Sequence, residues 1–385
     1  MKDFLFPCAF ILLSLWGCQS RENGRTQKQL PKENTYETYP LTLEYAQNLE
    51  IHYLQGITLV KIGEPFKGSS QSLTYYFIPK DLAVPDSLLN EAIIRTPVER
   101  FACTSTTHLP ALDLLGVTDR LVGFPSLKFV SSPQVRALAR EGKVVDLGKD
   151  YSLNVEQVIE ADPGVLMSYS LDGDYKDLGP IQKAGIDILM NADYLENDPL
   201  GRAEWIKFFG LLFHKEKEAD SIFNTIASDY RQVLGQAQAT GYGPTTFCGI
   251  DYKGVWYMPG GDSWMGKFLK DAQASYYWGN DTSTGSMELS FETVYDSAYE
   301  ADVWINAHTF KSLEELGEAD ERYKRFRAFQ KGAIYNSNAR LTPEGGNDYY
   351  ESGTVRPDIV LKDLVKIFHP DLLPNYKLYY FQKLN

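Results

Sequence analysis

A long helical pattern in the middle of the chain places the strongest constraint on its fold. Between Arg202 and Leu234, apolar residues recur every three or four positions, and few helix breakers interrupt them apart from Gly210. At 1.5 Å per residue, a helix of this length spans roughly 50 Å, which is longer than one small lobe. We therefore predict a single long helix over residues 201–238 that connects two lobes.

Strand-like and helix-like segments alternate at short spacing on both sides of this helix. The predicted strands of the first half cover residues 97–103, 120–124, 144–147, 164–167 and 186–190, and those of the second half cover 245–252, 255–258, 301–306 and 333–335. Alternation of this kind is typical of a parallel sheet covered by helices. The predicted fold class is α/β, with two Rossmann-like lobes, residues 36–200 and 239–385, joined by the long helix.

The first residues have the pattern of a lipoprotein signal peptide, residues 1–18. Lys2 precedes an apolar run that ends at Trp16, and this run is shorter than the about 20 residues that a membrane-spanning helix needs. Gly17 and Cys18 follow, as in the bacterial lipobox, where a small residue precedes the cysteine whose thiol carries the lipid. The bulky Trp16 departs from that pattern, and a plain signal peptide is the alternative. Residues 19–35 are polar and predict a flexible tether.

Charge, histidines and cysteines exclude several classes of function. The net charge of −13 argues against nucleic acid as a partner. A bare-metal site needs three or four converging ligands, whereas the five histidines are scattered over positions 52, 108, 214, 308 and 369. Cys103 and Cys248 lie in apolar, strand-like runs, which favours two buried thiols over a disulfide. We predict no metal site made by the protein and no cofactor.

Motifs of catalysis give little support to an enzyme. The stretch from Gly260 to Trp264 superficially resembles the nucleophile loop of GDS-type hydrolases, but it lies deep in the chain instead of near the start of a domain. The alternative GxSxG elbow fails because Met265 stands where the last glycine is required. The glycines are explained more simply by a turn before a helix that starts at Trp264.

Four blocks in a fixed order carry a resemblance to a known family: HLPALDLLGVTDRLVGF, NVEQVIEADPGVLM, ADVWIN and VRPDIVLKDLVKIFHP, the first two separated from the last two by the long helix. They resemble the helical-backbone class of periplasmic binding proteins, which are receptors for iron–siderophore complexes, haem and cobalamin. The resemblance covers residues 95–370. It implies two α/β lobes joined by one long helix, a ligand bound between the lobes, and no catalytic residue.

The resemblance places the ligand at the carboxyl ends of the strands, as in other open α/β sheets. It implies ligand contacts from the first lobe by Ser105, Thr106, His108, Ser168 and Tyr169, and from the second lobe by Tyr252, Trp256, Tyr257, Trp264, Trp278, Asn306 and His308. Aromatic walls with a few polar groups suit a large planar ligand. The alternative for each aromatic residue is packing in the core.

The family delivers its ligand to the permease of an ABC importer through an acidic residue on each lobe. Glu351 matches the second-lobe position, and Asp113 is the nearest acid to the first-lobe position. The implied protein is a monomer held on the periplasmic side of a bacterial membrane by its lipid alone. Its ligand is a metal chelate: an iron–siderophore complex ranks first, cobalamin or another corrinoid second, and haem third. A surface lipoprotein that scavenges a ligand without an importer is the alternative role.

Overall fold

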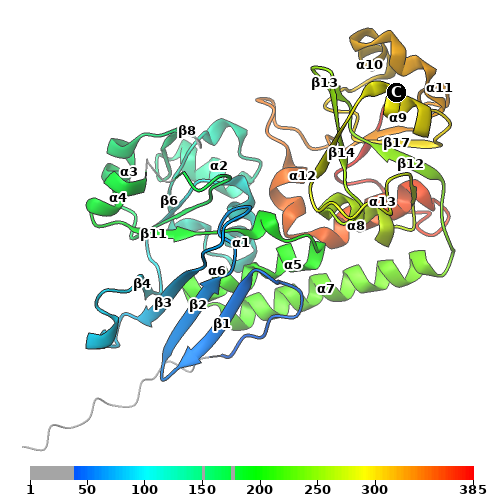
Figure 1. Ribbon diagram of the computed structural model, residues 1–385. Helices are drawn as coiled ribbons and strands as arrows, with labels where there is room; N and C mark the ends of the chain where they lie inside the picture. The colour runs from blue at the N-terminus through cyan, green and yellow to red at the C-terminus, as the bar shows by residue number, and fades with distance from the viewer. Residues whose placement is uncertain (1–38, 150–151, 175–177) are drawn as a thin grey trace, which may run out of the picture. The chain divides into compact units, whose positions relative to one another are not determined.

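Two sheets of mostly parallel strands form the centres of two α/β lobes (Figure 1). The computed structural model describes residues 39–149, 152–174 and 178–385, so the signal peptide, Cys18 and the tether lie outside the described residues. The first-lobe sheet is parallel throughout, in the order β11–β10–β5–β6–β7. Its strands are β5 (Phe101–Cys103), β6 (Leu121–Phe124), β7 (Val145–Asp146), β10 (Val165–Ser168) and β11 (Asp187–Met190). Every residue of β5 and β10 is buried, as expected for parallel strands covered on both faces.

The second-lobe sheet has the order β15–β12–β17–β18–β19, in which β19 alone runs antiparallel to its neighbour. Its strands are β12 (Thr245–Cys248), β15 (Ser275–Tyr276), β17 (Val303–Ile305), β18 (Ile334–Asn336) and β19 (Gln382–Lys383). A three-stranded antiparallel sheet belongs to the same lobe: β13 (Asp251–Tyr252), β14 (Val255–Pro259) and β16 (Ser286–Leu289). The α/β fold class predicted from the sequence is confirmed.

A four-stranded sheet at the start of the described chain adds to the first lobe. Its strands, in spatial order, are β1 (Leu49–Leu54), β2 (Ile57–Ile62), β3 (Leu73–Pro79) and β4 (Ile93–Thr96). Two buried carboxylates hold the segment before β1: Glu204 accepts the backbone N–H groups of residues 44–46, and Glu196 accepts those of residues 47 and 48. The small ribbon of β8 (Gly148–Lys149) and β9 (Ser152–Leu153) completes the strands of the first lobe.

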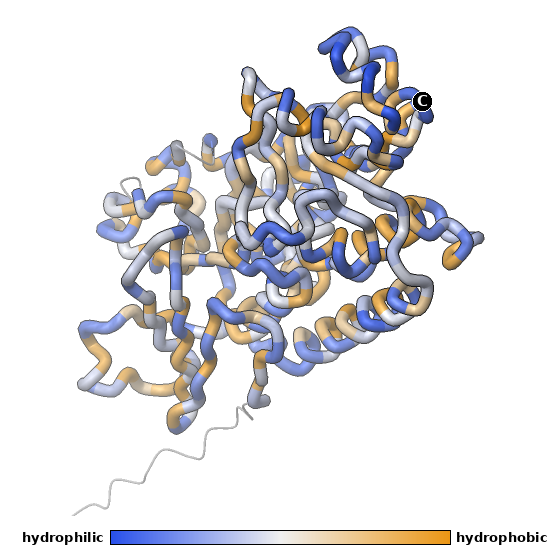
Figure 2. Tube along the Cα trace, turned by 45° about the vertical axis from the view of Figure 1, so that its right-hand side comes forward, coloured by the Kyte–Doolittle hydropathy of each residue, from blue (hydrophilic) through white to orange (hydrophobic). Residues whose placement is uncertain are grey.

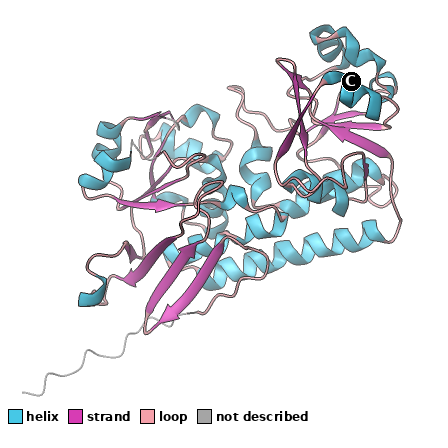
Figure 3. Cartoon of the chain, in the orientation of Figure 1, coloured by secondary structure: helices cyan, strands magenta, loops and turns pink. Residues whose placement is uncertain are grey.

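The helices lie beside the strands of both sheets (Figure 3). In the first lobe they are α1 (Leu109–Leu115), α2 (Pro133–Arg140), α3 (Val155–Ala161) and α4 (Leu178–Lys183). In the second lobe they are α8 (Trp264–Asp271), α9 (Phe291–Ala298), α10 (Leu313–Ala319), α11 (Arg327–Gln330), α12 (Asp348–Glu351) and α13 (Pro357–Phe368). None of the helices in the described part of the chain has the length and apolar character to cross a bilayer.

The predicted single helix over residues 201–238 is wrong in its extent, because the chain forms three helices there. These are α5 (Pro199–Glu204), α6 (Ile206–Phe213) and α7 (Glu216–Gln238). His214 ends α6 in the left-handed conformation, with φ of 55°, and its N–H caps the carbonyl of Gly210. A Cβ on Gly210 would lie 2.8 Å from the Cβ of Ala219, so glycine allows α7 to fold back closely against α6.

Helix α7 is the element that links the two lobes. At 1.5 Å per residue its 23 residues span about 35 Å. It packs against α6 on one side and α13 of the second lobe on the other, and Figure 2 shows hydrophobic and hydrophilic residues alternating along it. Its buried stripe includes Phe223, Tyr230 and Val233. The boundaries predicted for the lobes stay predictions, since residues 38–385 cluster as one compact unit.

The two cysteines of the described chain are free and buried, which confirms the prediction of two thiols. Cys103 lies on β5 and Cys248 on β12, each in the central part of its own sheet. Burial raises the pKa of both thiols well above its ordinary value, so neither is a reactive thiolate at neutral pH.

Candidate ligand-binding site

The order in which strands are added to the first-lobe sheet reverses between β5 and β10. Open α/β sheets bind their ligands at such a switch point. From β5 the chain continues to β6 and β7 on one side, and it returns to β10 and β11 on the other. The residues that follow β5 and those that end β10 therefore meet at the carboxyl edge. The hydroxyl oxygens of Thr104 and Ser168 lie 3.3 Å apart there.

A cavity of about 460 Å³ opens at this edge, within the range of small-molecule sites. Its lining comes from the loops after three neighbouring strands and from the β8–β9 ribbon: Thr104, Ser105 and Thr106; Phe124, Pro125, Ser126, Lys128 and Phe129; Lys149; and Tyr169. Ser105, Thr106 and Tyr169 are residues that the sequence predicted. We take this cavity, called the switch-point cavity below, as the candidate site.

Local backbone structure fixes two of the loops that line the switch-point cavity. Ser105 begins a short 3-10 helix, Thr106–His108, by accepting the N–H of Thr107 on its side-chain oxygen. After β6 the chain turns at Ser126, whose φ is 53°, and the N–H of Ser126 donates to the carbonyl of Gly148 over 2.8 Å. Both loops are therefore held by hydrogen bonds before any ligand arrives.

The lining combines cationic, phenolic and apolar groups. Lys128 is exposed, and its ammonium group lies 4.8 Å from the centre of the Phe129 ring, a cation–π distance. Lys149 adds a second cationic side chain, and Tyr169 a phenol. The lining holds these two lysines and no aspartate or glutamate, although the whole chain carries a net charge of −13. Such a lining suits a ligand that has both anionic groups and apolar surface.

Three predicted contact residues belong to the core and offer the cavity little or no surface. Trp256 is 0% exposed, and its indole N–H donates to the carbonyl of Cys248 within a cluster of aromatic rings. His108 is 1% exposed and packs beside Phe209. Ser168 is also buried, beside Thr104. The prediction that these side chains contact ligand is corrected on the ground of their burial.

The buried His108 imidazole has an unusual environment. Within the described part of the chain, neither of its ring nitrogens has a hydrogen-bond partner. Burial lowers the pKa of His108 to about 3, so the ring is neutral at physiological pH. A neutral ring with unpaired nitrogens costs desolvation free energy without any compensating bond.

The second-lobe residues predicted from the sequence do not reach the switch-point cavity. Tyr252, Tyr257 and His308 are exposed, and Trp264, Trp278 and Asn306 are partly buried. The indole of Trp264 lies under the guanidinium of Arg202, and Asn306 accepts the N–H of Ser337. The structure therefore brings the first-lobe predictions together but leaves the second-lobe set dispersed.

The sequence argument missed several lining residues that follow β6, including Ser126, Lys128 and Phe129. A signal for them was available, because the strand over residues 120–124 was predicted and its carboxyl end lies at the same edge as that of β5. Lys149 had no such signal, since it enters from the β8–β9 ribbon.

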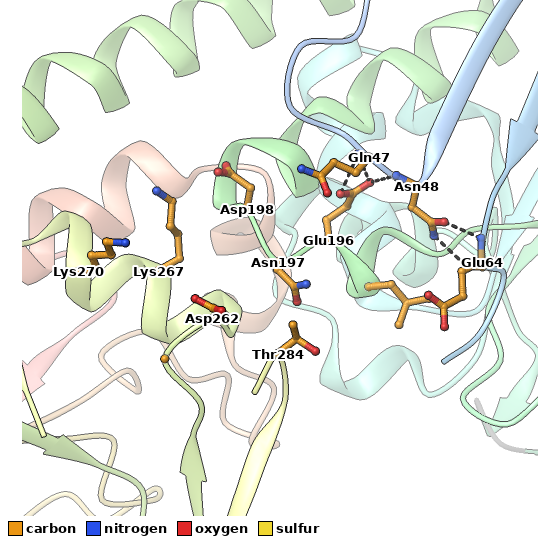
Figure 4. A pocket seen from close by; sticks show the side chains of 12 residues that line it. Gln47, Asn48, Glu64, Glu196, Asn197, Asp198, Asp262, Lys267, Lys270 and Thr284 are labelled. Atoms are coloured by element: carbon orange, nitrogen blue, oxygen red, sulfur yellow. Dashed lines mark hydrogen bonds between the residues drawn. The ribbon is translucent and has the colours of Figure 1, made fainter. Parts of the chain in front are cut away.

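A larger cavity, of about 620 Å³, lies elsewhere and is lined mostly by polar groups (Figure 4). Three of its charged groups have structural tasks. Glu196 accepts backbone N–H groups, Asp198 caps α5 by accepting the N–H of Leu200, and Lys267 pairs with Asp271 over 3.1 Å. The switch-point cavity is the better candidate because three residues that the sequence predicted, Ser105, Thr106 and Tyr169, line it, whereas none of the predicted residues lines the larger cavity.

The two acids predicted to dock a permease share a third cavity, of about 200 Å³. Asp113 is partly buried and accepts the hydroxyl of Thr118 over 2.6 Å. Glu351 is only 3% exposed, and its two carboxylate oxygens accept the N–H groups of Ser131 and Ser132 at 2.7 Å each. The prediction of an exposed docking carboxylate at Glu351 is therefore corrected: the helix α12 inserts this side chain against the first lobe.

The pKa of the Glu351 carboxyl group is raised above the ordinary value of a glutamate. Burial raises its pKa to about 7, and the nearby acids Asp348 and Asp113 act in the same direction. The two N–H donors lower the pKa but do not cancel the effect of burial.

Comparison with known sequences agrees with this architecture. The family model for periplasmic binding proteins matches residues 102–341. Two uncharacterized lipoproteins of Methanocaldococcus jannaschii are similar to the chain. One is 28% identical over 307 residues, which cover 77% of this chain and 71% of the relative. The other is 25% identical over 402 residues, with 96% of each chain covered.

Solved structures share the fold at low identity. A periplasmic binding protein from Veillonella parvula has a TM-score of 0.57 and 14% identity, covering 80% of this chain and 98% of its own. A periplasmic haem-binding protein from Pseudomonas aeruginosa has a TM-score of 0.56 and 17% identity, with 75% and 98% covered. A Helicobacter pylori protein with Ni(II) bound has a TM-score of 0.56 and 14% identity, with 74% and 88% covered. With its two α/β lobes, its linking helix α7 and the matched residues 102–341, the chain belongs to the periplasmic binding protein family, in the class with a helical backbone.

Proposed function

We propose that this protein is an extracytoplasmic receptor that captures an anionic metal chelate in the switch-point cavity and delivers it to the permease of an ABC importer. The observation that carries the proposal is the pairing of Lys128 and Lys149 with Tyr169 and Phe129 in one cavity. Cations and a phenol suit the oxygen-rich, negatively charged surface of a ferric chelate, while Phe129 suits its apolar parts.

The chelator is proposed to supply the metal ligands. Among the described residues, no group of three or more histidines, cysteines or acids could hold a metal ion. A metal would therefore enter as part of a larger molecule. The haem-binding protein of P. aeruginosa and the Ni(II)-containing protein of H. pylori share the fold, and they support a metal-containing ligand.

A ferric chelate is favoured over a corrinoid by the chemistry of the lining. Cobalamin offers a broad flat face that stacks well on tryptophan, whereas the side chains that line the switch-point cavity are lysine, hydroxyl-bearing and phenylalanine residues with one proline. Cobalamin remains the second candidate and haem the third.

Membrane attachment and delivery complete the proposed role. The lipobox pattern at Cys18 and the lipoprotein relatives support a lipid anchor on the outer side of a membrane, with residues 19–35 as the tether. Delivery to a permease follows from the role of the family, and Asp113 on α1 is the acid proposed to face it. The importer supplies ATP hydrolysis, so this chain needs no catalytic residue, and a monomer suffices.

The test is a ligand panel on the full-length protein in detergent. Isothermal titration calorimetry with a ferric tris-catecholate complex, haemin and cyanocobalamin compares the three classes. Saturable binding of the ferric complex below about 1 μM, a standard free energy near −8 kcal/mol, is the expected result. Binding of cyanocobalamin alone would transfer the assignment to corrinoids, and binding of none would refute the proposed ligand class.

A further inference from the structure

A segment of the first lobe connects the switch-point cavity with the second lobe. Residues 126–132, called the wall segment, contribute Ser126, Lys128 and Phe129 to the cavity lining. The same segment ends in Ser131 and Ser132, whose N–H groups donate to Glu351 of the second lobe. One short stretch of chain therefore contacts the cavity at one end and the other lobe at its other end.

The wall segment is stiff enough to transmit a displacement from one end to the other. Internal turn bonds join Phe129 to Ser126 and Val130 to Leu127, and the Val130 side chain is fully buried. Ser132 then caps α2 by accepting the N–H of Val135 on its hydroxyl oxygen. Only residues 130–132 lie between Phe129, the last cavity-lining residue of the segment, and Pro133 at the start of α2, so a shift at Ser131 and Ser132 also moves Phe129.

The second lobe holds Glu351 as firmly as the first lobe holds the wall segment. Asn347 caps α12 by accepting the N–H of Tyr349, and its amide donates to the carbonyl of Ser337. The hydroxyl of Thr354 donates to the Glu351 carbonyl over 2.7 Å. These bonds hold the backbone at Glu351 within the second lobe, while its carboxylate accepts the N–H groups of Ser131 and Ser132 in the first lobe.

The cationic side chains near Glu351 pair with other acids, so the N–H groups of Ser131 and Ser132 are what compensates the burial of its carboxylate. Arg340 and Arg356 line the same cavity as Glu351, but they pair with Asp348 and Asp358. Among the described residues, Glu351 forms no ion pair with a lysine or arginine. A buried carboxylate without a cation depends strongly on its hydrogen bonds, so it holds its two donors tightly.

A second contact reinforces the first. Gly346 packs so closely against the wall segment that a Cβ at this position would overlap the carbonyl group of Phe129. Glu344, two residues earlier, only approaches Arg136 at 3.8 Å and is exposed. The contact between the lobes is thus tight at Gly346 and Glu351 and loose at Glu344.

We propose that Glu351 is a positioning residue for the ligand: its carboxylate, carried by the second lobe, fixes the wall segment and so fixes Lys128 and Phe129 in the switch-point cavity. This inference rests on the proposed function, because it assumes that the cavity binds the chelate. Ligand binding and the contact between the lobes are then coupled, and each strengthens the other.

The test uses the full-length protein with three variants and one matched control. Glu351→Ala removes both acceptors, Glu351→Gln keeps one acceptor and the side-chain volume, and Gly346→Ala pushes on Phe129 without changing charge. Glu344→Ala removes a carboxylate from the same loop without touching the wall segment. Each protein is assayed by amide hydrogen exchange over residues 126–135 and by calorimetric titration with the ferric tris-catecholate complex.

The expected result is fast exchange at Ser131 and Ser132 in Glu351→Ala, with affinity for the ferric complex about tenfold weaker. Glu351→Gln should restore part of both properties, Gly346→Ala should weaken binding similarly, and Glu344→Ala should behave as wild type. If the wild-type protein binds the ferric complex and Glu351→Ala binds it equally well, the positioning role is overturned while the proposed function stands. If the wild-type protein itself does not bind, the proposed function fails first, and the inference falls with it.

Discussion

The titration of Glu351 makes a quantitative prediction about stability. Its pKa is about 7 in the folded protein, against 4.5 for an unperturbed glutamate. Because the folded state binds this proton more tightly, the contribution of Glu351 to stability is largest below pH 4.5 and is lost as the pH rises through 7. A difference of this size corresponds to roughly 3 kcal/mol, at 1.36 kcal/mol for each pKa unit. The carboxyl group is 3% exposed, so solvent screening reduces this figure little.

Glu351→Gln isolates this contribution, since glutamine does not titrate. The free energies of unfolding of wild type and variant are measured by urea denaturation between pH 4.5 and 8.5. Other titrating groups act equally in both proteins and cancel in the difference. The advantage of wild type over the variant should shrink by roughly 3 kcal/mol across this range. A difference that stays constant with pH would show that folding does not raise the pKa of Glu351, and it would refute the argument.

Three further outcomes are expected. His108→Leu should raise the unfolding free energy by about 1 kcal/mol in urea denaturation, because both buried ring nitrogens lack partners; a loss would contradict this. Gly210→Ala should lower the unfolding free energy by about 1–3 kcal/mol, since the new Cβ meets Ala219. Unchanged stability would refute the close packing of α6 against α7 at this point. Cys18→Ala should release the protein from membranes in fractionation, whereas continued attachment would exclude the lipid anchor.

The sequence predicts the parts of the fold that depend on local pattern. Buried strands such as Val165–Ser168 and the loops after them follow from apolar runs and the direction of parallel strands. For that reason Ser105, Thr106 and Tyr169 lie together at the carboxyl edge, while their contact with a ligand stays a prediction. The end of α6 at His214 was not predictable in this way, because the apolar spacing continues through it and only tertiary packing at Gly210 and Ala219 ends the helix.

Features that depend on distant contacts escape the pattern of the sequence. Trp256 and Tyr257 are neighbours on β14, and alternation alone does not say which faces the core; Trp256 is 0% exposed and Tyr257 is 45% exposed. Glu351 presents a stronger case, since its partners Ser131 and Ser132 lie about 220 residues earlier in the chain. An acid two residues before a glycine, in a loop-like segment, suggests exposure, and only the contact between the lobes buries it.

The account depends most directly on the switch-point cavity being the ligand site. The decisive measurement is calorimetric titration of a ferric tris-catecholate complex into wild type, the double variant Lys128→Glu with Lys149→Glu, and Lys270→Glu. Lys270 is an exposed lysine that lines the larger cavity of about 620 Å³, so it is a matched control for the change in charge. We predict that the double variant binds at least about 100-fold more weakly, because charged hydrogen bonds contribute about 1.5–3 kcal/mol each, while Lys270→Glu binds as wild type does. Strong binding by the double variant, with weak binding by Lys270→Glu, would place the ligand in the other cavity and contradict the account.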